Sequence, residues 1–284
     1  MAAALCFGST FPVTKEALEG TGPYAVVGLR FAAGGFLALP FALRRPRLTT
    51  AAVEGRAVAW CSLALLAGYL LLTVGLQSTS STAAAFITYL LVVIVPVLSA
   101  VVLRTRLPAP VVLGVVLATS GLFLLAGDGF RLGVGEVLTL GCAFAFAVHI
   151  LVLDHFAARV DVIRLSAFQL LVVGAGALVP ALLRGELVDL DAGGLAACGF
   201  LALAGVGGLV LQVAGQRSVG PARTSLLLML EPVLAAIGGY AIGERIAPLG
   251  FVGAALILAG ILVSEVPAGR DRRRRLDQAA VQGG

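Results

Sequence analysis

The sequence predicts an all-α membrane protein with ten transmembrane helices in two inverted five-helix repeats, and three observations lead to this fold class. The 284-residue chain is 60% hydrophobic and 12% charged, whereas soluble domains are about half apolar and a quarter charged. Its apolar residues form long runs, such as 83–103 and 247–263, each long enough to cross about 30 Å of hydrocarbon as a helix. Finally, the second half of the chain repeats the pattern of the first.

Helices are favoured over a β-barrel because the apolar runs are continuous. Backbone amides find no water in the bilayer core, so only helices or closed barrels span it. Barrel strands alternate apolar and polar residues, while leucine, valine, alanine and glycine dominate these runs without such alternation. The charged residues stand between the runs, which therefore mark the individual helices.

The first five helices are expected at residues 2–18, 23–43, 57–77, 82–103 and 109–126. Because no basic segment precedes the first helix, we expect it to act as its own insertion signal rather than as a cleaved signal peptide. A turn from Gly20 to Pro23 separates it from the second helix, and Gly127 to Gly129 forms the turn after the fifth.

The second five helices are expected at residues 134–154, 162–183, 193–214, 221–242 and 247–264. The turn Ala192 to Gly194 opens the third of them, and all connections are too short to hold a soluble domain. Residues 265–284 are too charged to span a membrane and too short to fold alone. We expect this tail to lie on an anionic inner leaflet through five arginines, namely Arg270, Arg272, Arg273, Arg274 and Arg275.

The basic residues predict the orientation when the connections are assigned alternately to two sides. One side, which includes the tail, holds fifteen: Arg44, Arg45, Arg47, Arg56, Arg104, Arg106, Arg159, Arg164, Arg217, Arg223 and the five tail arginines. The other holds four: Lys15, Arg131, Arg184 and Arg245. Cytoplasmic loops carry the excess of Lys and Arg. We therefore expect both termini in the cytoplasm and the protein in the cell's inner membrane.

An internal repeat appears when the chain is shifted against itself by 139 residues without a gap. The shift superposes Gly35 on Gly174, Gly68 on Gly207, Gln77 on Gln216, Arg106 on Arg245, Gly114 on Gly253 and Gly121 on Gly260. We therefore expect repeats over residues 1–127 and 133–264. Because five is an odd number, the second repeat enters the membrane from the opposite side, as in many secondary transporters. The first helix begins late relative to its mate, so we expect either an upstream start before Met1 or a short first helix.

The sequence lacks the common motifs of hydrolytic enzymes and of ATP-binding proteins. It contains no HExxH, GxSxG or GxxxxGK[ST] pattern and no pair of intramembrane aspartates. Four cysteines, Cys6, Cys61, Cys142 and Cys198, fall inside apolar runs without CxxC spacing and are expected to be buried apolar residues. We therefore expect no catalytic residues, no metal, no cofactor and no nucleic acid partner. An intramembrane enzyme and a non-transporting sensor or assembly protein are the alternatives to a carrier.

Several short motifs resemble those of drug/metabolite transporters of the EamA type. In the first half they are Leu5 to Phe11 with Lys15, Gly28 to Phe31, and Ala83 to Phe86 followed by Pro96; in the second half they are Gly135-Glu136, Ala147 to His149, Gln169, Leu230 to Pro232 and Gly243 to Arg245. The chain departs from the pattern at Arg104-Thr-Arg106, where Gly-Glu-Arg is usual. The resemblance implies a ten-helix carrier with cytoplasmic termini that moves small metabolites or drugs, usually outward.

Glu231 is the foremost candidate site residue because it falls near the middle of the predicted helix 221–242. An ionised carboxylate there costs about 2.5–3.5 kcal/mol on insertion scales unless it is paired or protonated. Pro232 removes a backbone donor and frees a carbonyl one turn back, so the two residues could open the helix at the depth of a binding site. Glu231 then contacts substrate or a coupled proton, or else it is a protonated residue that fixes a kink.

Arg30 and Gln169 occupy equivalent positions in the two repeats. The guanidinium stays charged and needs water, a carboxylate or carbonyls inside the membrane. Each side chain either ties its helix to a neighbouring helix or, in the case of Arg30, attracts an anion.

Three further polar residues, His149, Tyr89 and Gln212, lie in predicted helices and could face a cavity. His149 either relays protons or packs as a hydrogen-bonded residue. Trp60, near a helix end, is expected in an interfacial aromatic belt.

Glycines at seven-residue spacing, Gly114 with Gly121 and Gly253 with Gly260, mark small-residue faces, and Gly239 with Gly243 marks another. Such faces let helices approach closely. They pack within the protomer or, alternatively, form a homodimer contact.

Overall fold

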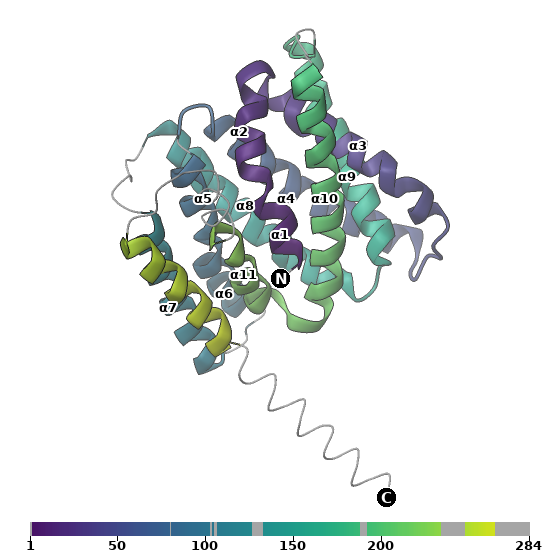
Figure 1. Ribbon diagram of the computed structural model, residues 1–284. Coiled ribbons are helices and arrows are strands. Elements are labelled where there is room, and N and C mark those ends of the chain that lie inside the picture. Colours follow the sequence, from purple (N-terminus) through teal and green to yellow (C-terminus); the bar gives the residue numbers. More distant parts are fainter. Residues whose placement is uncertain are drawn as a thin grey trace, which may run out of the picture.

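A computed structural model of the chain describes residues 2–79, 81–102, 104, 107–126, 133–187, 192–233 and 248–264. Within these residues the regular secondary structure is entirely helical, which confirms the predicted all-α class. Figure 1 shows the helices as a bundle. Their bounds are α1 Ala2–Gly8, α2 Thr10–Gly20, α3 Pro23–Leu43, α4 Ala51–Gly75, α5 Ser81–Tyr89, α6 Leu91–Val102, α7 Ala109–Ala126, α8 Val134–Ala157, α9 Val162–Leu183, α10 Ala192–Val219, α11 Pro221–Leu228 and an unlabelled helix Pro248–Ser264.

Six helical segments of the described part are long and apolar enough to cross a membrane. They are Pro23–Leu43, Ala51–Gly75, Ala84–Val102, Val134–Ala157, Val162–Leu183 and Ala192–Val219. Two further apolar helices, Ala109–Leu124 and Pro248–Ser264, are shorter. Large apolar side chains such as Phe36, Trp60 and Leu183 are exposed on the outer surface, which suits a lipid environment rather than water.

Three predicted helices are interrupted. The predicted helix 2–18 is divided at Ser9 into α1 and α2, and 82–103 is divided at Leu90 into α5 and α6. The predicted helix 221–242 ends as α11 at Leu228, and a helical turn follows at Leu230–Val233. The remainder of that prediction, 234–242, lies outside the described residues, as do the tail arginines.

The predicted start of the third helix at residue 57 was too late. Helix α4 begins at Ala51, where the Thr50 side chain caps it by accepting a hydrogen bond from Val53 N at 3.4 Å. Arg56 was counted among the connections from the sequence, but it lies within α4, and Glu54 in the first turn of this helix is buried and ion-paired. A charge near a helix end is compatible with the helix once a partner neutralises it.

Helices α3 and α9 pack closely and run antiparallel. A Cβ atom added at Gly28 would lie 2.8 Å from the Leu178 side chain, and one at Gly35 would lie 2.7 Å from that of Leu171. Residue numbers rise along α3 as they fall along α9, which defines the antiparallel direction. Glycine is required at both positions because any side chain would push the two helices apart.

Helix α7 and the helix Pro248–Ser264 form a second antiparallel pair, seen side by side in Figure 1. A Cβ atom added at Gly114 would lie 2.6 Å from the carbonyl oxygen of Gly260. A Cβ atom added at Gly121 would likewise come too close to the carbonyl oxygen of Gly253. The two predicted glycine faces therefore pack against each other within the protomer. The third face, Gly239 with Gly243, lies outside the described residues.

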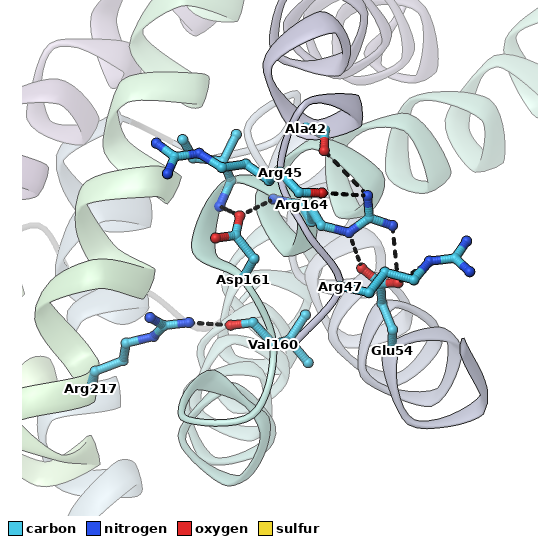
Figure 2. A network of polar contacts seen from close by, with 9 residues as sticks. Ala42, Arg45, Arg47, Glu54, Val160, Asp161, Arg164 and Arg217 are labelled. Atoms are coloured by element: carbon cyan, nitrogen blue, oxygen red, sulfur yellow. Dashed lines mark hydrogen bonds and ion pairs between the residues drawn. The ribbon is translucent and has the colours of Figure 1, made fainter. Parts of the chain in front are cut away.

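A polar network joins three helix ends at one end of the α3–α9 pair (Figure 2). Arg164, in the first turn of α9, pairs with Glu54 of α4 at 2.6 Å and donates to the carbonyl of Ala42 at 3.2 Å at the end of α3. Asp161 caps α9 by accepting from the amides of Ile163 and Arg164 at 3.0 and 3.1 Å. From the sequence, Arg164 was counted among the basic residues at the cytoplasmic ends of the helices; in the structure its side chain is buried.

The opposite end of the same helix pair is joined by Glu186, which follows α9. Its Oε2 accepts a hydrogen bond from the Ala25 amide in the first turn of α3 at 2.9 Å. The negative charge of Glu186 thus lies at the N-terminus of α3, the positive end of the α3 dipole. The positive charge of Arg164 lies at the C-terminus of α3, the negative end of the same dipole. Both ends of α3 are tied to α9 by charged side chains.

The two largest apolar clusters of the described residues lie in different parts of the bundle. One lies among α3, α4, α8, α9 and α10 and includes Leu153, Leu165 and Leu170. The other lies among α5, α6, α7, α11 and Pro248–Ser264 and includes Leu122 and Ile257. The predicted burial of cysteines is confirmed for Cys61, Cys142 and Cys198, while Cys6 is half-buried.

Candidate functional site

A central cavity receives side chains from both halves of the chain. Residues before position 127 that line it are Phe7, Thr10, Thr14, Arg30, Phe31, Leu65, Tyr69, Leu72, Thr73, Leu76, Thr88, Tyr89 and Leu91. Residues after position 133 are Phe146, His149, Ile150, Gly205, Leu209, Gln212, Leu228 and Glu231. The lining is largely apolar, with a small set of polar groups, as is usual for sites that bind small molecules.

The structure brings five of the six sequence candidates to this cavity: Glu231, Arg30, His149, Tyr89 and Gln212. The sixth, Gln169, does not line it but contacts His149 from α9. Their roles in binding stay predictions; the geometry establishes that they share one location.

Arg30 is 2% exposed and lies two turns into α3. Its Nη1 donates to the Thr14 hydroxyl at 3.2 Å, and its guanidinium carbon is 4.5 Å from the ring centres of both Phe31 and Tyr69. Cation–π attraction of this kind is worth about 2 kcal/mol when desolvated. The aromatic contacts and the hydroxyl therefore hold the cation in place without neutralising it.

Glu231 and Tyr89 connect the two halves across the cavity. The Tyr89 hydroxyl donates to the Glu231 Oε2 atom, and both side chains are at most 6% exposed. Tyr89 is the last residue of α5, directly before the interruption at Leu90, and Glu231 follows the interruption at Met229. The interruption at Met229 lies three residues before Pro232, which has no amide to donate to the Leu228 carbonyl four residues back.

His149 is held in a fixed ring orientation by Gln169. Its Nε2 lies 2.9 Å from the amide oxygen of Gln169. An amide oxygen can only accept, so Nε2 donates and carries a proton. Both residues are at most 2% exposed.

Sequence reasoning missed the threonines of the cavity. Thr14 accepts the hydrogen bond of Arg30, and Thr10 lies one helical turn before it on the same cavity wall. Two threonines four residues apart in an apolar run mark one helix face, so their spacing was the available signal. The ion pair between Glu54 and Arg164 was also missed, because Arg164 was considered only for the orientation of the chain in the membrane.

Comparison with known proteins agrees with this architecture. The profile of the EamA-like transporter family matches residues 1–127 and 133–265. An uncharacterized transporter of Archaeoglobus fulgidus is 30% identical over 265 residues, covering 92% of this chain and 82% of that protein. A WAT1-related chloroplastic protein of Arabidopsis thaliana is 27% identical over 291 residues, covering 93% of this chain and 68% of that protein.

A solved crystal structure shares the fold, with a TM-score of 0.73 over 95% of this chain and 98% of the other, at 21% identity. The Archaeoglobus relative is named as a transporter. The family profile extends over both halves of the chain, and six helical segments of the described residues are of membrane-spanning length. The protein is therefore a multi-pass membrane transporter that belongs to the EamA-like transporter family.

Proposed function

We propose that the protein is a secondary transporter that exports a small organic solute by alternating access of two inverted repeats, without ATP hydrolysis. The observation that carries this proposal is the central cavity, where polar side chains of both halves converge: Arg30 and Tyr89 from the first, His149, Gln212 and Glu231 from the second. A site between two repeats is open to alternate sides when one repeat moves against the other.

The packing supports the inverted arrangement of the repeats 1–127 and 133–264. Under the 139-residue shift α3 corresponds to α9, and α7 corresponds to Pro248–Ser264; each helix packs antiparallel against its mate. The interruptions at Leu90 and Met229 also correspond under this shift. Helices that are equivalent but run in opposite directions are what an inverted repeat requires.

We propose ten membrane crossings from the same correspondence between the two repeats. Helices α1 and α2 together form the first crossing, α5 and α6 the fourth, and α11 begins the ninth. On the positive-inside rule both termini are cytoplasmic and the protein lies in the cell's inner membrane. Arg270 and the four arginines Arg272–Arg275 then contact anionic lipid headgroups.

Within the cavity we propose that Glu231 and Arg30 contact the solute, while Tyr89 orients the Glu231 carboxylate. His149 and Gln212 contribute further polar contacts, and Gln169 acts through His149. The buried Tyr89–Glu231 hydrogen bond supports this division because it links the two repeats. Movement of one repeat against the other would therefore change the surroundings of the carboxylate.

The test begins with a solute screen that compares export or resistance in cells with and without the gene. The solute it finds is then followed in liposomes that contain purified protein. Glu231→Gln or Arg30→Ala is expected to lower transport while expression is kept, whereas Glu16→Gln, which changes an exposed carboxylate of α2, leaves transport unchanged. Normal transport by both cavity variants would refute the assignment of the cavity as the solute site. The absence of any transported solute would refute the proposed transport function.

A further inference from the structure

Arg30 is a buried cation whose hydrogen-bonding capacity is only partly used. Among the described residues the ion pairs are Arg47 and Arg164 with Glu54, so no carboxylate lies within 4 Å of the Arg30 guanidinium. Thr14 accepts from Nη1, but Nε is buried without any partner. A buried charge without a counterion is costly. Within the described part of the chain, no negative group therefore balances the charge of Arg30.

The aromatic contacts leave one side of this guanidinium uncovered by rings. Its carbon lies 4.5 Å from each ring centre of Phe31 and Tyr69, and the two centres are 4.5 Å from each other. Three equal distances form an equilateral triangle, so both rings lie on the same side of the cation. The rings therefore approach the guanidinium from one direction, and Arg30 also lines the cavity.

Glu231 does not supply the missing charge. Its carboxylate is engaged by the Tyr89 hydroxyl and lies beyond ion-pair distance from Arg30, although both residues line the cavity. A guanidinium pairs with a carboxylate through two parallel hydrogen bonds, which suits an Nε and an Nη donor. A ligand with a carboxylate would therefore satisfy the unused Nε as well as the charge.

The rest of the lining defines the body of such a ligand. Phe7, Leu65, Phe146 and Leu209 present apolar surface to the same cavity. We propose that the transported solute is an organic monoanion with a carboxylate and an apolar body, and that the carboxylate binds Arg30. This inference rests on the proposed function and narrows its substrate class.

Three probes of equal size and different charge test the proposal: benzoate, benzamide and protonated benzylamine. Their binding to the purified protein in nanodiscs is measured by titration calorimetry. Benzoate is expected to bind at least about tenfold more tightly than the other two, the size expected for one hydrogen-bonded charge contact. Arg30→Gln, which places at position 30 the residue type of the repeat mate Gln169, should remove this preference. Arg56→Gln, at an exposed position of α4, should keep it.

A second variant covers the case in which Arg30→Gln does not fold. Arg30→Lys keeps the charge but loses the paired donors, so it should retain a reduced preference for benzoate. Equal affinities of the wild-type protein for the three probes would overturn the proposal. So would an unchanged preference in Arg30→Gln, and so would binding of none of the probes, since each carries the apolar ring that the lining should hold.

The two proposals fail in different ways. A protein that exports a neutral or cationic solute but shows no preference for benzoate keeps its transport function and loses the assigned substrate class. A protein that binds benzoate through Arg30 but moves no solute in cells or liposomes keeps the binding site and loses the transport function.

Discussion

Arg164 Nε lies 2.6 Å from Glu54 Oε1, and its Nη2 lies 3.0 Å from Oε2, so the guanidinium and the carboxylate pair through two hydrogen bonds. Both side chains are buried, and the same guanidinium reaches the Ala42 carbonyl. Three helix ends therefore meet at one ion pair, as Figure 2 shows. Removal of Glu54 leaves the buried Arg164 without a carboxylate partner, and removal of Arg164 leaves the buried Glu54 with only the exposed Arg47 as its ion-pair partner.

Arg164→Met should lower the free energy of unfolding by about 3 kcal/mol, because Glu54 loses both hydrogen bonds. The measurement is denaturant unfolding in detergent. Arg47→Met is the matched control, because the Arg47 side chain is 61% exposed and its contact with Glu54 is 3.3 Å long; an exposed pair contributes about 0–1 kcal/mol. Equal losses in the two variants would contradict a special role for the buried pair.

Gly114→Ala should destabilise the protein by about 1–3 kcal/mol, because the new Cβ meets the Gly260 carbonyl oxygen at 2.6 Å. Gly199→Ala in α10 meets no atom within 4 Å and should be neutral or stabilising by up to about 1 kcal/mol. Thermal unfolding of the two variants in the same detergent compares them. A change of oligomeric state in Gly114→Ala without loss of stability would point to a dimer contact instead.

Tyr89→Phe should reduce transport about tenfold or more, because a hydrogen bond to a charged group contributes about 1.5–3 kcal/mol. The phenyl ring is kept, so the apolar contacts of α5 should persist and expression should stay normal. Initial rates in liposomes measure the effect. Tyr24→Phe makes the same atomic change at a ring that stacks with Arg184 outside the cavity, and its rate should match that of the wild type.

Gln169→Leu should lower the free energy of unfolding by about 1–3 kcal/mol, because the His149 Nε2 proton loses its acceptor in a buried site. Gln77→Leu, at an exposed position, is the control. If His149 serves packing alone, transport by the folded Gln169→Leu protein stays normal. A lower rate at unchanged stability would instead assign the pair to transport.

A topology experiment tests the predicted orientation. Alkaline phosphatase fused to the C-terminus should be inactive, and green fluorescent protein fused there should fluoresce, because the arginine-rich tail is expected in the cytoplasm. Phosphatase fused after Glu186, on the side with few basic residues, should be active. The opposite pattern at both positions would reverse the orientation.

The sequence by itself determined the membrane class and many helix bounds. Three predicted ranges, 23–43, 109–126 and 162–183, coincide with α3, α7 and α9. The physical reason is local: an apolar run of this length must satisfy its own backbone hydrogen bonds, and a helix does so within the segment. The candidate residues of the cavity could also be identified from the sequence. A charged or polar side chain within an apolar run is energetically costly in a membrane, so its presence indicates a specific role.

Only the tertiary structure decided where the helices are interrupted and which distant groups meet. Tyr89 and Glu231 are 142 residues apart, and Arg164 and Glu54 are 110 apart. No local periodicity encodes these contacts, because they depend on how helices from the two halves pack. The same packing places Gly114 against Gly260 inside the protomer and lets buried Glu54 remain in a helix. Backbone hydrogen bonding thus fixed the elements, while close packing and the pairing of buried charges fixed their arrangement.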